Sequence, residues 1–177
     1  MEIKNKYKIQ EGLYWYKTIM DMLDTEKFCS EDFRKAFNHF YRVRQKKAQF
    51  YDVYYGIMKN YRTKPLSFKE IVTEIYEGYG EVHPSFSSKL IHTFNPDLPI
   101  WDSRVLKNLG FKGVPAYKKP LEKIEMASKL YQTLCDWYEK YLNSKKGKDD
   151  VKLFDELFPD YKDISNTKKI DFILWSK

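Results

Sequence analysis

Cysteine, histidine and glycine are scarce in this sequence, and each shortage excludes a class of protein. The two cysteines, Cys29 and Cys135, are too few for a disulfide framework, and we expect both to be packing residues. The three histidines, His39, His83 and His92, lack the spacing of zinc ligands, so we expect no metal and no cofactor. Seven glycines and seven prolines are too few for a collagen-like or linker-rich chain.

Long apolar runs are also missing. No uninterrupted apolar stretch approaches the ~18 residues that a membrane helix needs, and residues 1–6 lack the apolar core of a signal peptide. We therefore expect a cytoplasmic protein that does not enter a membrane. A chain of 177 residues fits one domain spanning 1–177.

Apolar side chains recur at helical spacing along most of the chain, and no stretch alternates as a strand would. The expected fold class is all-α, a single compact domain of about seven to nine helices. One helix is predicted over about 11–24, a second from Ser30, and a third that ends before Pro65. Pro120 begins the longest predicted helix, which we expect to be the central packing helix, and the polar stretch 143–148 predicts an exposed loop.

Several residues mark helix ends. Ser67 and Glu70 form the pattern of a capping box, in which each side chain accepts an otherwise unpaired amide. Gly80 ends that helix, and Pro84 opens the next at a position where its missing amide costs little. Asp102 is a suitable N-cap for a short helix after the turn at 95–99.

The net charge is +7, and it is concentrated in one segment. Residues 30–64 carry nine basic and three acidic side chains, which gives +6. Such a segment predicts an anionic partner, nucleic acid and in particular DNA. The excess of lysine over arginine is also what an AT-rich genome would give, and an acidic protein partner is the alternative.

A basic cluster lies in the turn expected between the second and third helices, and it comprises Arg42, Arg44, Lys46 and Lys47. Cations of this kind hold phosphate, and the neighbouring rings of Tyr41, Phe50 and Tyr51 could stack bases. The other interpretation is a solvated turn beside core aromatics.

Common enzyme motifs such as a phosphate-binding glycine loop or a metalloprotease helix are absent, and one unusual segment remains, 83–105. It resembles the core of the helix-hairpin-helix DNA glycosylases, in which a Pro-Gly-x-Gly hairpin leads into a helix bearing a lysine. A Pro-x-Asp-Thr-x-Val segment then caps a further helix of that family. Here the run Pro84–Lys89 has the same order, with Ser85 and Ser87 in place of the glycines, and Pro99–Val105 is similar to the aspartate segment with one residue added.

The resemblance implies a DNA base-excision glycosylase or lyase activity. The family's lysine nucleophile falls on Lys89 and its aspartate on Asp102. A desolvated lysine would attack the sugar carbon, and the carboxylate would stabilise the positive charge that develops there. The hairpin at Ser85 and Ser87 would hold a backbone phosphate, and the target base would be flipped out of the stack.

Other interpretations stay open at this point. Asp102 could be only an N-cap and Lys89 only a solvated helix residue, while Trp101 and Arg104 could line a polar pocket or serve packing and an ion pair. The protein would then be a non-catalytic helical binding module or a protein-interaction domain without enzymatic activity.

Overall fold

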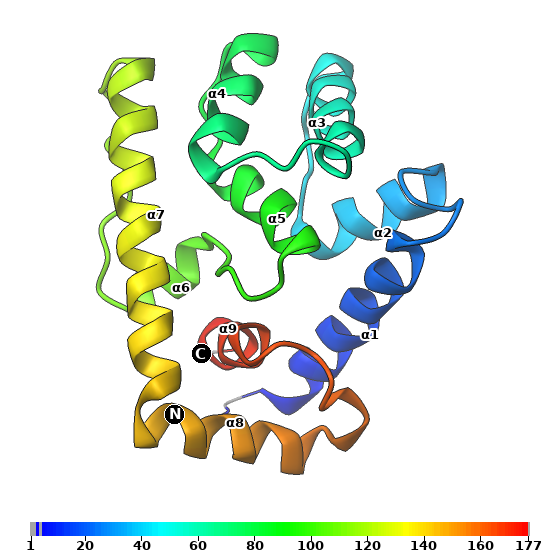
Figure 1. The fold of residues 1–177 in the computed structure, drawn as a ribbon, viewed down its shortest axis with the longest axis vertical. Helices are drawn as coiled ribbons and strands as arrows, with labels where there is room; N and C mark the ends of the chain where they lie inside the picture. The colour runs from blue at the N-terminus through cyan, green and yellow to red at the C-terminus, as the bar shows by residue number, and fades with distance from the viewer. Residues whose placement is uncertain (1–2, 4, 177) are drawn as a thin grey trace.

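Helices account for the regular structure of the chain (Figure 1). The computed structural model describes residues 3 and 5–176, and in that part nine α-helices and one 3₁₀ helix occur without any strand. The all-α prediction is therefore confirmed. The helices are α1 (Lys6–Leu23), α2 (Glu31–Tyr41), α3 (Ala48–Tyr61), α4 (Phe68–Tyr79), α5 (Pro84–Phe94), α6 (Ser103–Asn108), α7 (Pro120–Asn143), α8 (Lys145–Leu157) and α9 (Asn166–Trp175), with a 3₁₀ turn at Pro159–Tyr161.

The predicted helix ends are present. Ser30 accepts the amide of Phe33 at the start of α2, and the capping box of Ser67 and Glu70 opens α4. Gly80 ends α4 with a φ of 85°, which glycine adopts without steric cost. The first helix begins earlier than its apolar spacing predicts, because the side chain of Asn5 caps it by accepting the amide of Lys8.

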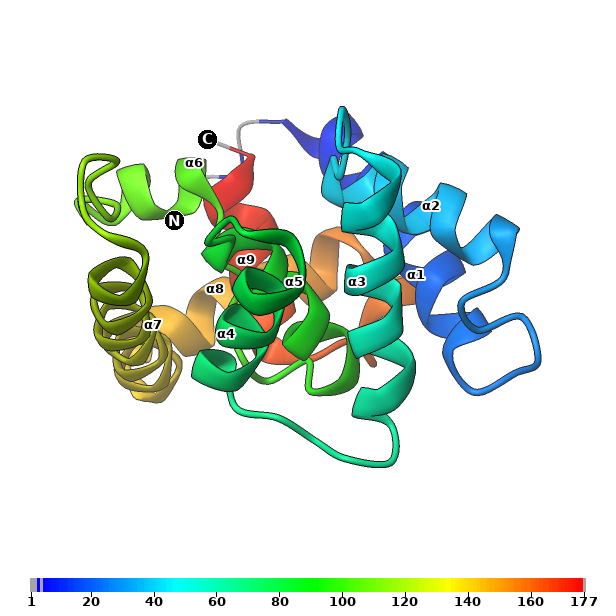
Figure 2. The same ribbon diagram turned by 90° about the horizontal axis from the view of Figure 1, so that it is seen from above.

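The central helix of the fold is α9. All residues from Thr167 to Leu174 are buried, and α9 runs through the middle of the molecule while α7 lies along one side (Figures 1 and 2). The prediction that the longest helix is central is wrong, because α7 buries one stripe of side chains along its length and leaves its other faces exposed. Because α9 contains several polar and charged residues, its sequence does not indicate that the helix is buried. Within the described residues, no helix is long and apolar enough to cross a bilayer.

The expected loop at 143–148 is also wrong. Ser144 ends α7 and caps α8, and its hydroxyl accepts the amide of Gly147. The polar residues after it are therefore the first turn of α8, which turns sharply away from α7 (Figure 1).

Gly147 allows this sharp turn, so we expect Gly147→Ala to lower the free energy of unfolding by at least about 2 kcal/mol. A methyl group there would collide with the backbone carbonyl of Tyr141. Gly56→Ala is the matched control, because its methyl group would meet nothing within 4 Å inside α3. That variant should gain about 0.5–1 kcal/mol. Urea denaturation measures both, and equal stabilities would contradict the steric argument.

Candidate active site

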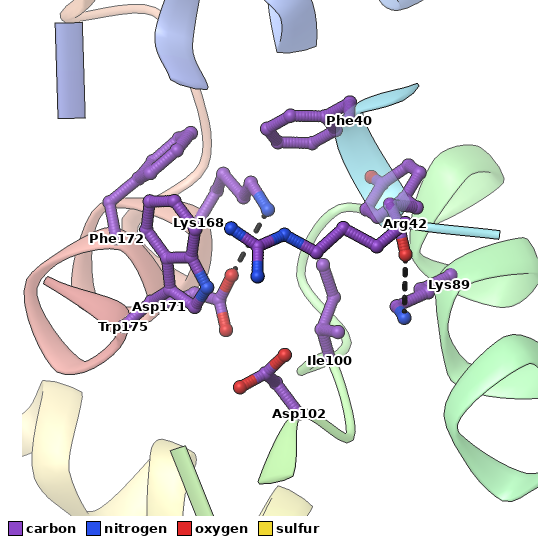
Figure 3. A pocket seen from close by; sticks show the side chains of 10 residues that line it. Phe40, Arg42, Lys89, Ile100, Asp102, Lys168, Asp171, Phe172 and Trp175 are labelled. Carbon is purple, nitrogen blue, oxygen red and sulfur yellow. Dashed lines mark hydrogen bonds and ion pairs between the residues drawn. The ribbon is translucent and has the colours of Figure 1, made fainter. Parts of the chain in front are cut away.

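A pocket of about 110 Å³ lies where α2 ends against α5, α9 and the segment before α6 (Figure 3). An engineered cavity of about 150 Å³ binds benzene, so this smaller pocket limits an enclosed ligand group to at most about the size of one small ring, such as a sugar. The lining residues are Phe40, Tyr41, Arg42, Lys89, Ile100, Asp102, Lys168, Asp171, Phe172 and Trp175. They combine aromatic walls with three cations and two carboxylates, which is the composition of a polar binding site rather than of a packing defect.

Lys89 projects from α5 into the pocket and is buried, with 8% of its surface exposed. Its Nζ donates a hydrogen bond to the backbone carbonyl of Tyr41 at 3.0 Å. Burial lowers the pKa of Lys89 to about 8, although the charges of Asp102 and Asp171 act against that shift. A substantial fraction of the amine is therefore neutral near pH 8, as a nucleophile requires. The alternative of a solvated helix residue is wrong.

Asp102 lines the same pocket although thirteen residues separate it from Lys89. The connection is a hydrogen bond of 2.8 Å from the backbone amide of Trp101 to the hydroxyl of Ser88. Each of these two residues directly precedes a pocket residue, so the bond holds the segment of Asp102 against α5 and both side chains line one pocket, although the Asp102 carboxylate is not within ion-pair distance of Lys89. The carboxylate of Asp102 also caps α6, since Oδ1 accepts the amides of Arg104 and Val105. The capping role and the pocket position therefore coexist.

A buried ion pair on α9 forms another wall of the pocket, and sequence reasoning missed it. Lys168 Nζ lies 3.0 Å from Asp171 Oδ2, and the two side chains are 2% and 8% exposed. The rings of Tyr16 and Phe172 surround the ammonium group at 5.0 and 4.8 Å from their centroids. Burial lowers the pKa of Lys168 and raises that of Asp171, while their mutual attraction opposes both shifts. The signal in the sequence was two opposite charges three residues apart, the second of them between apolar residues.

The helix predicted to begin at Pro84 is confirmed, and the hairpin that the resemblance implies at Ser85 and Ser87 is wrong. The run Pro84–Lys89 forms the first two turns of α5, and the chain turns before it, between Gly80 and His83. Ser87 is fully buried and its hydroxyl donates to the carbonyl of His83, so its predicted contact with a phosphate is wrong. Ser85 is partly exposed at the second residue of α5, where a phosphate contact stays a prediction.

The basic cluster is split by the structure. Arg42 lines the pocket, and its side chain extends across it toward Trp175 (Figure 3). Arg44 and Lys47 are exposed and point to solvent outside the pocket. Lys46 contacts Glu81, with 3.4 Å between Nζ and Oε2, so its charge is partly neutralised. Contact of these four residues with nucleic acid stays a prediction.

Neither Trp101 nor Arg104 lines the pocket. The Trp101 ring is buried and stacks on Phe68, 6.4 Å between centroids, because the segment before α6 turns it toward α4. Arg104 is exposed at the start of α6, 5.9 Å from the ring centroid of Trp175. Trp175, which sequence reasoning did not select, is the tryptophan of the pocket.

The chain matches no protein-family model, and it has no significant similarity to a curated protein or to a solved structure. The resemblance of 83–105 to the helix-hairpin-helix glycosylases therefore depends on those residues alone. In the described part of the chain, no group of three or more histidine, cysteine, aspartate or glutamate side chains could hold a metal ion.

Proposed function

We propose that the protein is a nucleic-acid lyase or glycosylase in which Lys89 is the nucleophile and Asp102 the stabilising carboxylate. One observation carries the proposal: a buried lysine whose pKa is lowered to about 8 lines the same pocket as Asp102. A perturbed titratable group beside a charge partner in a concave site is typical of catalysis. The substrate is a nucleic acid, DNA in particular, and the expected location is the cytoplasm.

The chemistry follows from the two side chains. On an abasic site, the neutral amine of Lys89 adds to the sugar aldehyde, the carbonyl oxygen leaves as water with the two amine protons, and a proton from solvent gives the protonated imine. On an intact nucleotide, the amine would instead form a bond to the sugar carbon while the glycosidic bond breaks, and the base would leave with the electron pair of that bond and take up a proton from solvent. The carboxylate of Asp102 stabilises the positive charge in both cases. Oδ2 is available for this role, since within the described residues both capping bonds go to Oδ1.

Borohydride trapping tests the proposal. A duplex with one abasic site is incubated with the protein and sodium borohydride, which reduces an imine to a stable amine. We expect a covalent protein–DNA adduct, and no adduct with a tetrahydrofuran analogue of the site, which has no aldehyde. Absence of adduct at every pH from 6 to 10 would overturn the proposal. Salt-sensitive binding without adduct would identify a non-catalytic binding module instead.

The rate of adduct formation should depend on pH in a specific way. Only the neutral amine reacts, and the pKa of Lys89 is about 8. The rate should therefore rise about tenfold per pH unit below 8 and level off above it, which amounts to roughly 50-fold between pH 6 and pH 8. Single-turnover trapping with excess protein measures it. A rate that keeps rising to pH 10 would show an ordinary, exposed lysine.

A further inference from the structure

Three cations surround the ring of Trp175 at the rim of the pocket. Lys8 Nζ lies 3.8 Å from the ring centroid, and the guanidinium carbons of Arg42 and Arg104 lie 6.0 and 5.9 Å from it. They come from α1, from the residue that ends α2 and from α6, so only the fold brings them together. We call Lys8, Arg42 and Arg104 the Trp175 cation triad.

Within residues 5–176, no ion pair neutralises the positive charge of this triad. Three described carboxylates lie around it: Asp102, whose charge acts on Lys8; Glu11, which lines a groove beside Lys8 and Arg42; and Asp171, which lines the pocket with Arg42 and is paired with Lys168. With Lys168 in the pocket and Arg44 in the groove, five cations face these three carboxylates, which leaves an excess of positive charge. Burial and the charges of Arg104 and Arg42 lower the pKa of Lys8, as mutual repulsion requires.

The backbone at Arg42 supports a functional role for its side chain. Arg42 ends α2 in the left-handed conformation, with a φ of 54°. Helices commonly use glycine at such an end, because a Cβ atom disfavours the left-handed conformation. Here a long cation occupies this position, and that cation lies over the pocket (Figure 3). Strain of this kind concentrates at binding sites.

We propose that the Trp175 cation triad binds one phosphate group of the nucleic-acid backbone, next to the sugar that enters the pocket. Two guanidinium groups and one ammonium group supply more donors than a carboxylate can accept, and they suit the several oxygens of a phosphate. The identity of this ligand, a phosphate of a nucleic acid, rests on the proposed function. The triad replaces the buried Ser87 and the paired Lys46 as the expected phosphate contact nearest to Lys89.

The salt dependence of DNA binding tests the site. The affinity for an abasic duplex is measured by fluorescence anisotropy across a salt series for wild type, Lys8→Gln, Arg42→Gln and Arg104→Gln. Each variant should reduce the slope of log K against log salt, by up to about 0.9, the value for complete loss of the one phosphate contact that the three cations share. Lys107→Gln is the matched control, because Lys107 is an exposed cation on α6 outside the triad. Its slope should equal that of wild type.

Arg42→Gly separates binding from folding. Glycine relieves the left-handed backbone but gives the unfolded chain more freedom, so the midpoint of unfolding in urea should stay equal or rise. The salt slope should fall as in Arg42→Gln. A variant that is as stable as wild type and binds less well shows that the cation serves the ligand rather than the fold.

The outcomes separate the phosphate site from the lyase chemistry. If the three triad variants keep the wild-type slope while wild type forms the borohydride adduct, the phosphate site is wrong and the proposed function stands. If the slopes fall but no adduct forms, the phosphate site stands and the chemistry of Lys89 is wrong. If wild type does not bind DNA even at low salt, both are wrong.

Discussion

Lys89→Met should reduce the borohydride adduct to background, a loss of at least about a thousandfold, because methionine has no amine to form the imine. Methionine fills nearly the same volume, so the buried position is preserved without its charge. The amine it removes bonds only to the backbone carbonyl of Tyr41 among the described residues. Binding of abasic duplex should change little, since the triad and the exposed cations are intact. Denaturing gel electrophoresis of the trapped reaction measures the adduct.

The pocket contains a second lysine, so the loss must be shown to be specific. Lys168 is fully paired with Asp171 and enclosed by aromatic rings, which hold it in place as a cation. Lys89 has no carboxylate within ion-pair distance among residues 5–176, and its amine deprotonates near pH 8. The two environments predict opposite results for the two lysines. Lys89→Met should lose the adduct, whereas a Lys168→Met/Asp171→Leu double variant should still form it. If that variant loses the adduct and Lys89→Met keeps it, the nucleophile is Lys168 and our assignment is wrong.

The helix ends could be predicted from the sequence because they depend on neighbours a few residues apart. Ser30, Ser67 and Asp102 each cap a helix through amides two or three residues further along the chain. The position of a helix in the fold depends instead on which distant segments cover it. The apolar stripe of α7 therefore indicated a helix correctly and its central position wrongly.

In the candidate site too, features set by nearby residues could be predicted from the sequence, and features set by distant segments could not. The motif at 83–105 indicated Lys89 and Asp102, and the structure places both in one pocket. The ion pair on α9 lies more than sixty residues away from this motif, and charged residues at helical spacing normally indicate an exposed face. Arg42 was selected for its charge alone, whereas it lines the pocket from a left-handed backbone position that no sequence pattern predicted.

The ion pair of Lys168 and Asp171 yields the largest expected effect on stability. Asp171→Asn should lower the free energy of unfolding at pH 7 by about 3–5 kcal/mol, because it leaves a buried ammonium group without its counter-charge. Asp171 is 6% exposed and also accepts a hydrogen bond of 3.5 Å from Tyr138, so water cannot readily replace it. Urea denaturation at fixed pH measures the loss.

The double variant Lys168→Met/Asp171→Leu is the matched control, since it removes both charges and fills their volume with apolar atoms. Its stability should be within about 1–2 kcal/mol of wild type, although each single charge removal is costly. A double variant as unstable as Asp171→Asn would show that packing, not the unpaired charge, sets the loss.

The pH dependence of the stability of Asp171→Asn tests whether the unpaired ammonium group of Lys168 causes the loss. Burial already lowers the pKa of Lys168 in the wild-type fold, and without Asp171 only the weaker influence of the Asp102 charge opposes that shift. Folded Asp171→Asn protein therefore binds fewer protons than the unfolded chain over the range from its lowered pKa to about 10.4, the pKa of a free lysine. Its stability should rise with pH across that range, and the gap to wild type should narrow. A constant gap from pH 6 to pH 10 would mean that Lys168 has the same protonation state in both folded proteins across that range, and the loss would then not come from an ammonium group whose pKa the substitution lowers.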